Sequence, residues 1–152
     1  ESCVVAHLAA PGFDTAVVEM LAAALVGAAL AVVPDKIRGG TELAEFLNRH
    51  RVTHLLITPA ALATLPIDDI DTVTHLVVGG DVCPAPLIEL WAADHIVRCA
   101  YGPTEATCSV ALTEPIGSTA ARRRIELGGP MSGAGLLVLD RHLRPVPRLG
   151  EG

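Results

Sequence analysis

A Tyr-Gly-Pro-Thr-Glu segment in the second half of the chain groups side chains that could hold a nucleotide and a metal ion. Gly102 and Pro103 favour a tight turn whose backbone N–H groups can face an anion. Thr104 adds a hydroxyl donor, Glu105 a hard oxygen ligand suited to Mg²⁺, and Tyr101 a flat ring on which a base can stack. An ordinary surface turn would use the same glycine and proline, so the interpretation depends on the elements around this segment.

Short apolar runs alternate with helix-like segments along the chain. The runs predict strands at residues 3–9, 29–33, 54–58, 76–78 and 96–100, and a last strand at 136–139. Between them we expect a helix from Asp14, as its N-cap, to about residue 26, a second capped by Thr41, a short third after Pro59 and a fourth at 86–93. Buried strands interleaved with helices are typical of an α/β fold, here a doubly wound, mainly parallel sheet with flanking helices.

Four loops follow the carboxyl ends of the predicted strands. In a sheet of this kind, ligands bind beyond the carboxyl ends of the strands. We therefore expect the loops to meet at one edge of the sheet and to form a single site. They comprise residues 10–14, 58–59, 79–81 and 101–105.

The composition fits one soluble globular domain with no nucleic-acid partner. Of the 152 residues 51% are hydrophobic but only 3% are aromatic, so the core must be built from Ala, Val and Leu, as in close-packed α/β layers. The chain has eleven basic and seventeen acidic residues, which give a net charge of −6. The only basic run is three arginines at 122–124, which predicts a solvated loop rather than a nucleic-acid surface.

Cysteine usage and hydropathy indicate a cytoplasmic protein without a membrane partner. The start of the chain shows no secretory signal, so we expect reduced thiols. The apolar stretch at 20–33 is shorter than the ~20 residues that a membrane helix needs. The six histidines show no metal-ligand spacing, and no CxxC spacing occurs among the four cysteines, Cys3, Cys83, Cys99 and Cys108.

Three further segments occur in a fixed order with Tyr-Gly-Pro-Thr-Glu: FDTA from Phe13, GGDV from Gly79 and GGP from Gly128. Together they resemble the adenylation domains of nonribosomal peptide synthetases, within the superfamily of adenylate-forming enzymes. The pattern of that family contains FD-x-S, GGE-like, N-x-YGPTE and G-x-P segments, and LGEG at 149–152 resembles the start of its next segment. The resemblance covers essentially the whole chain and implies the central flavodoxin-like subdomain of such a domain.

The chain departs from the family pattern at three positions and lacks several of its parts. Ala16, Asp81 and Cys99 stand where the family usually has Ser, Glu and Asn. The phosphate loop of the family would lie before residue 1, and its ribose-binding Asp, hinge and catalytic Lys after residue 152. The only lysine, Lys36, is in the wrong place to substitute. We therefore expect an excised substrate-binding subdomain, with a mobile loop at 115–133 and a final strand and next segment at 134–152, that is inactive alone.

The resemblance implies roles for individual residues in the intact enzyme. Asp14 would pair with the α-ammonium group of an amino acid, and the enzyme would join the amino-acid carboxylate to the α-phosphate of ATP. The product would be loaded on the phosphopantetheine thiol of a carrier protein. Thr104 and Glu105 would be catalytic, Thr104 at the α-phosphate and Glu105 as the Mg²⁺ ligand. The ATP contacts would come from Gly80, Asp81, Ala100, Tyr101, Gly102 and Thr104, with Tyr101 stacked on adenine.

The side-chain pocket implied by the resemblance contains no charged residue. It falls on Thr15, Val18, Leu56, Val77, Gly79, Ala100, Cys108 and Ser109. A charged substrate side chain would be buried there without a partner, so we expect a neutral amino acid. Gly79 and Ala100 leave depth, and Val18 is smaller than the aromatic residue of many relatives, which favours a medium-to-large apolar or aromatic substrate. Val18, Leu56 and Val77 could equally be ordinary core residues.

Two alternatives remain open from the sequence. The first is a subdomain of an aryl-acid or acyl-CoA-type ligase, whose members generally lack a carboxylate at the position of Asp14. The second is a non-catalytic scaffold that binds a helper protein of the MbtH type. Ala85 and Pro86, before an expected helix, are a candidate surface for such a helper.

Overall fold

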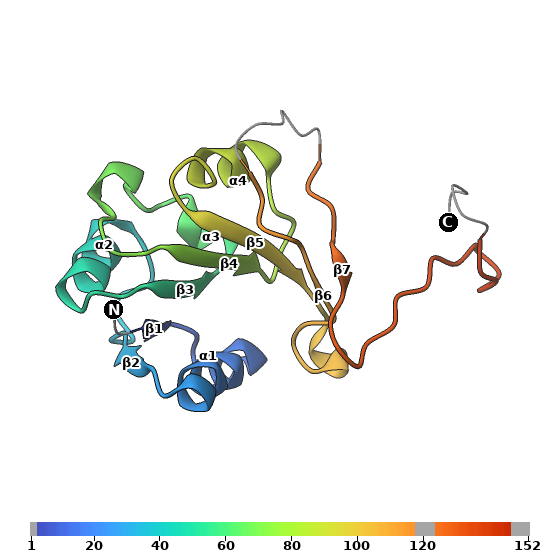
Figure 1. Cartoon of the computed structure of the whole chain (residues 1–152), viewed down its shortest axis with the longest axis horizontal. Coiled ribbons are helices and arrows are strands. Elements are labelled where there is room, and N and C mark those ends of the chain that lie inside the picture. Colours follow the sequence, from blue (N-terminus) through green and yellow to red (C-terminus); the bar gives the residue numbers. More distant parts are fainter. Residues whose placement is uncertain (1–2, 118–123, 147–152) are drawn as a thin grey trace.

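The structure, a computed structural model, describes residues 3–117 and 124–146. These residues form one sheet with the strand order β2-β1-β3-β4-β5-β6-β7 (Figure 1). The first five strands in this order run parallel, and β6 and β7 are antiparallel to their neighbours. The mainly parallel α/β fold predicted from the sequence is therefore confirmed. The strands are β1 Val4–His7, β2 Ala29–Val32, β3 His54–Ile57, β4 His75–Gly79, β5 Ile96–Tyr101, β6 Ala111–Leu112 and β7 Gly129–Pro130.

Helices lie on both faces of the sheet. Figure 1 shows α2, α3 and α4 on one side, whereas α1 lies on the other side against β1 and β2. Among the described residues, no helix combines the length and the apolar character that crossing a bilayer requires. The helices are α1 Asp14–Val26, α2 Gly40–Arg49, α3 Pro59–Leu62 and α4 Ala85–Trp91, and two 3₁₀ turns are η1 Ile67–Asp69 and η2 Thr104–Ala106.

The two faces of β3, β4 and β5 differ in burial. Alternate residues of these strands are buried in one core with side chains of α2, α3 and α4. The residues between them are half-buried on the opposite face. Successive side chains of a strand point to opposite faces. This alternation therefore places a second set of side chains on the face of the sheet where α1 packs against β1 and β2.

Both predicted helix caps are wrong by one or two positions. Phe13 is the N-cap of α1, with extended backbone, and Asp14 is the first helical residue. No side chain forms a capping hydrogen bond there. The second helix begins at Gly40, and the hydroxyl oxygen of Thr64 accepts its N–H at 2.9 Å. A threonine just after α3 thus supplies the oxygen that was expected from Thr41.

The last part of the chain differs from the expected pattern. Residues 136–139 form no strand, and within the described residues their only pairing is one antiparallel bridge, from Leu139 to Pro145. The predicted loop at 115–133 lies partly outside the described residues, but Ile116 pairs with Val97 and Gly129–Pro130 form β7. Residues 118–123 and 147–152, including two of the three arginines and the LGEG segment, lie outside the described residues.

Candidate functional site

The four loops predicted to form one site follow neighbouring strands. Strands β1, β3, β4 and β5 are adjacent and parallel, so the loops after them emerge at the same edge of the sheet. The loops after β3 and β4 lie close together, because a Cβ atom added at Gly80 would be only 3.6 Å from Cγ2 of Thr58. Gly79 and Ala100 are register partners at the ends of β4 and β5.

A contact between Thr15 and Cys108 closes this arrangement. The Thr15 hydroxyl oxygen lies 3.8 Å from the Cys108 sulfur. Thr15 belongs to the first turn of α1, and Cys108 follows the Tyr-Gly-Pro-Thr-Glu segment. The segments that follow the first and the last of the four loops therefore meet across the carboxyl edge of β3 and β4.

The backbone after η2 is held in an unusual conformation that makes this contact. Thr107 and Cys108 both have left-handed backbone, with φ of 64° and 72°. Such a conformation is costly for residues other than glycine and is concentrated at functional sites. It turns the chain back over Gly102, where an added Cβ would overlap the carbonyl oxygen of Cys108. Gly102 is therefore required for this turn, because a side chain there would meet the backbone of Cys108.

The residues predicted to line the side-chain pocket share one region of the structure. Leu56 pairs with Val77 in register, and Gly79 pairs with Ala100, so these four lie on the same face of the sheet. This is the half-buried face on which α1 lies. Thr15 and Val18 are three positions apart in α1 and share a side of the helix. All eight predicted residues are half-buried, as is Asp14.

Gly79 has a role in the sheet itself. A Cβ atom there would lie 2.9 Å from the carbonyl oxygen and 3.4 Å from the Cβ of Ala100. No side chain fits at this position without a shift of the backbone of β5. The glycine is thus explained by the close approach of two strands, whether or not it also gives a pocket its depth.

The carboxylate of Asp14 is available to a ligand. It accepts a hydrogen bond from the hydroxyl of Thr15 at 3.5 Å and caps no helix. Among the ion pairs formed within residues 3–117 and 124–146, none includes Asp14. A half-buried carboxylate without a cation beside the sheet edge is suited to bind a cationic group.

The side chains predicted to bind a nucleotide and Mg²⁺ are accessible. Tyr101 is 47% exposed, and Thr104 and Glu105 are exposed on the 3₁₀ turn η2. Within the part of the chain that the structure describes, no three His, Cys, Asp or Glu side chains cluster as a metal cage. A single carboxylate fits Mg²⁺, which usually keeps several waters and binds through one or two carboxylates and substrate phosphates. Asp81 differs, because its carboxylate accepts the Val82 N–H at 2.7 Å within its own loop.

A buried charged residue of α1 was not identified from the sequence. Glu19 is fully buried, and its carboxylate lies 2.8 Å from Nδ1 of His7. Burial raises the pKa of Glu19, although the Ala9 N–H and His7 partly oppose the shift. The signal that could have found it is a single acidic residue in the middle of an otherwise apolar helix.

The cysteines take different positions. All four are free thiols. Cys99 is buried beside Cys83, and the contact with the Cys83 thiol, together with burial, raises the pKa of Cys99. Cys99 therefore fits the expectation of a reduced apolar filler, whereas Cys108 belongs to the arrangement at the edge of the sheet.

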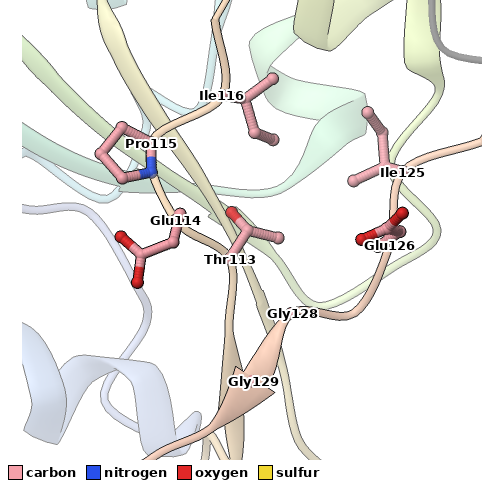
Figure 2. A pocket seen from close by; sticks show the side chains of 8 residues that line it. All are labelled: Thr113, Glu114, Pro115, Ile116, Ile125, Glu126, Gly128 and Gly129. Carbon is pink, nitrogen blue, oxygen red and sulfur yellow. The ribbon is translucent and has the colours of Figure 1, made fainter.

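A cavity of about 350 Å³ lies away from the predicted site residues. It lies between the segment that follows β6 and the segment that leads into β7, and Figure 2 shows Ile116 and Ile125 approaching it from these two segments. None of the residues that line this cavity belongs to the predicted side-chain pocket. Its lining consists of Thr113, Glu114, Pro115, Ile116, Ile125, Glu126, Gly128 and Gly129.

Comparison with known families decides the assignment of the chain. The model of a family described as AMP-binding enzyme matches residues 1–152. The chain belongs to this family.

Individual relatives agree with this assignment. The chain is 38% identical over 142 residues to "Novobiocin biosynthesis protein H" of Streptomyces niveus, covering 93% of this chain and 23% of the relative. It is 40% identical over 137 residues to "Isonitrile lipopeptide synthase" of Mycobacterium tuberculosis, covering 90% of this chain and 5% of the relative. The chain thus spans less than a quarter of these relatives.

A solved structure shows the same fold. The structure of holo-PA1221, a nonribosomal peptide synthetase protein containing adenylation and PCP domains, superposes with a TM-score of 0.84 at 22% identity. The match covers 96% of this chain and 26% of that one. The fold predicted from the resemblance is therefore confirmed.

Proposed function

We propose that this chain is the substrate-selecting core of an adenylation domain of a nonribosomal peptide synthetase. In the complete domain, a neutral amino acid would react with ATP to form an aminoacyl-AMP and pyrophosphate. The aminoacyl group would then move to the phosphopantetheine thiol of a carrier domain. Membership of the AMP-binding family and the fold shared with an adenylation–PCP protein support the reaction class.

The contact of Thr15 with Cys108 carries the proposal for the substrate site. It joins the loop that contains Asp14 to the segment that follows the nucleotide-binding turn. The amino acid and the nucleotide must meet for the amino-acid carboxylate to attack the α-phosphate. A single edge that presents Asp14 on one side and Thr104 on the other satisfies this requirement.

Asp14 would select amino acids over simple carboxylic acids. At an effective dielectric constant near 20, opposite unit charges about 4 Å apart gain roughly 4 kcal/mol before desolvation. Because Asp14 has no cation of its own among the described residues, the ammonium group of the substrate would supply one. An aryl-acid or acyl ligase would have no use for this carboxylate.

The nucleotide would bind on the other side of this edge. Tyr101 would stack on adenine, and Gly80 and Ala100 would present backbone groups to its edge. Thr104 would donate to the α-phosphate, and Glu105 would hold Mg²⁺. Mg²⁺, when bound, would supply charge neutralisation of the phosphates. The role of the chain is then to position the carboxylate and the phosphate in line.

The carrier domain is the main proposed partner in the cytoplasm. An MbtH-like helper is a further one. Pro86, in the first turn of α4, is exposed and Leu90 is 54% exposed, whereas Ala85 is buried. A helper would therefore contact Pro86 and Leu90 rather than Ala85.

The test uses a full-length protein that contains this sequence. Pyrophosphate exchange is measured with the twenty amino acids and with the matching acids that lack the amino group. The expected result is exchange with one or a few neutral amino acids and little with the matching acid. Equal exchange with both members of a pair would favour an acyl or aryl ligase and contradict the proposal. A protein that binds a helper but supports no exchange would indicate a scaffold.

A further inference from the structure

The peptide unit between Leu8 and Ala9 is bound on both sides by side chains of opposite charge. The Ala9 N–H donates to both carboxylate oxygens of Glu19, at 3.2 Å each. The carbonyl oxygen of Leu8 accepts a hydrogen bond from Nη1 of Arg38 at 2.7 Å. Arg38 is itself held by Asp35, at 3.0 Å. One peptide plane is thus fixed by a carboxylate and a guanidinium.

This peptide stands at the entrance to the loop that carries Asp14. The next residue, Ala10, accepts the Phe13 N–H at 2.9 Å, and Phe13 accepts the Ala16 N–H at 3.1 Å. Hydrogen bonds therefore hold Ala9, Ala10 and Phe13 on the way to the first turn of α1. Glu19, one turn further along α1, reaches back to Ala9 and closes the segment into a ring that contains Asp14.

His7 completes the environment of the carboxylate. Its Nδ1 lies 2.8 Å from Glu19 Oε2, and its side chain is only 15% exposed. Glu19 is the only charged residue that is buried in the described part of the chain. Its carboxylate consequently has a partner for each oxygen and is held in one position.

Stability alone does not explain a carboxylate at this position. Burial raises the pKa of Glu19, which means that the charged form is disfavoured there despite its hydrogen bonds. Buried ion pairs are often no more stabilising than apolar residues of similar size. An acceptor aimed at the Ala9 N–H does, however, fix the direction in which the chain leaves β1.

We propose that Glu19 is a positioning residue that holds the Leu8–Ala9 peptide and so sets the place of Asp14 for substrate binding. His7 holds the Glu19 carboxylate, and Arg38 holds the same peptide from its other side. The proposal rests on the proposed function of Asp14 as the partner of the substrate ammonium group. Glu19 itself touches no substrate and acts through the loop. Its loss is expected to weaken amino-acid binding and to leave ATP binding unchanged.

The first measurement tests the geometry without any assay of activity. Hydrogen exchange is followed by mass spectrometry in a full-length protein that contains this sequence, for peptides that cover residues 9–13. Glu19→Gln keeps the size of the side chain but replaces one acceptor oxygen with an amide group. The Ala9 amide is expected to exchange faster in Glu19→Gln than in the wild type, while peptides of α4 are unchanged. Unchanged exchange at Ala9 would overturn the proposal.

The second measurement separates positioning from general destabilisation. Glu19→Gln and, on the opposite side of the peptide, Arg38→Gln are each expected to raise KM for the amino acid roughly tenfold, because small displacements of a binding group are costly. KM for ATP is expected to stay the same. Arg38 is 46% exposed, so its replacement leaves the core intact. The control is Ile88→Val, a core substitution in α4 that changes stability without touching the loop.

A combined variant tests whether Glu19 acts through Asp14. In an Asp14→Ala background, Glu19→Gln is expected to have no further effect on amino-acid-dependent exchange. If Asp14→Ala abolishes amino-acid selection but neither Glu19→Gln nor Arg38→Gln raises KM, the positioning role is wrong and the proposed function stands. If Asp14→Ala leaves KM unchanged, the function proposed for Asp14 fails, and the inference about Glu19 fails with it.

Discussion

The hydroxyl of Thr15 and the thiol of Cys108 lie 3.8 Å apart although 93 positions separate them in the chain. Between them the chain passes through β2, β3, β4 and β5. The contact makes the start of α1 and the segment after η2 two sides of one small region. A substitution on one side is therefore expected to alter what the other side can accommodate.

Replacing Asp14 with alanine is expected to reduce amino-acid activation to a small residual rate and to preserve the fold. Asp14 caps no helix, so the stability at risk is its interaction with the helix dipole, about 0.3–1 kcal/mol. The α-ammonium group of the substrate, by contrast, would lose the carboxylate proposed to bind it. Pyrophosphate exchange with the cognate amino acid and the melting temperature are measured together.

The matched control for Asp14→Ala is Asp94→Ala, which removes an exposed carboxylate after α4. This variant is expected to behave like the wild type in both measurements. Near-normal exchange by Asp14→Ala would show that the carboxylate does not bind the substrate.

Removal of the Tyr101 ring is expected to weaken ATP binding. Stacking of a base on an aromatic side chain is worth about 1–3 kcal/mol, so Tyr101→Ala should raise KM for ATP roughly tenfold or more. Tyr101→Phe keeps the ring and is expected to change KM little. KM for the amino acid should stay the same in both variants. A similar loss in Phe and Ala variants would point to the hydroxyl group and contradict the stacking role.

The pH dependence of stability is expected to differ between the wild type and Glu19→Gln. The pKa of Glu19 is raised in the folded state above its usual 4.5. A group with a raised folded pKa contributes stability below its unfolded pKa, and this contribution is lost as the pH rises through the folded pKa. From about pH 4.5 upward, the wild type should therefore lose stability relative to Glu19→Gln.

Urea unfolding of both proteins at several pH values checks this prediction. Each curve contains the titration of every other group. The difference between the two proteins cancels the groups that are remote from Glu19 and leaves position 19 together with its direct partner His7. A difference that does not change with pH would mean that Glu19 is not protonated more readily in the folded state.

The strands and helices could be predicted because their sequence signals are local. Apolar runs such as the one at β3, and the turn residue Gly27 after α1, mark elements without reference to the rest of the chain. The order of the loops along one edge then follows from the parallel sheet. The cap of α2 was misplaced because the oxygen at its start comes from Thr64, which is distant in sequence. The cap of α1 was misplaced because its N-cap, Phe13, forms no side-chain capping bond.

The finer geometry of the site depends on contacts that no local pattern reveals. Thr107 and Cys108 adopt a left-handed backbone although neither residue type favours it. The pairing of Glu19 with Ala9 and His7 needs the helix to lie on β1 at one particular height. Sequence motifs thus identify which residues gather, whereas the strained turn and the buried carboxylate determine how they face one another.

The last prediction concerns the size of the substrate side chain. The wild type is expected to prefer a neutral amino acid of leucine size or larger, because none of the half-buried residues predicted to line the pocket is charged. Gly79 is unsuited to a filling test, since any side chain there would meet the backbone of Ala100. Val18 is better placed, because it lies on α1 beside Thr15 and is half-buried.

Val18→Phe is expected to lower kcat/KM for large substrates more than for alanine. Overpacking typically costs about 1–3 kcal/mol, or roughly tenfold or more in specificity, and a small substrate reaches less far into the filled space. The control is Val17→Phe, the same substitution on the neighbouring residue, which is 50% exposed. It should leave the substrate preference unchanged, as measured by exchange rates over the amino acids. Equal losses for alanine and for the cognate substrate in Val18→Phe would remove Val18 from the pocket, and a wild-type preference for Asp, Glu, Lys or Arg would contradict its neutral character.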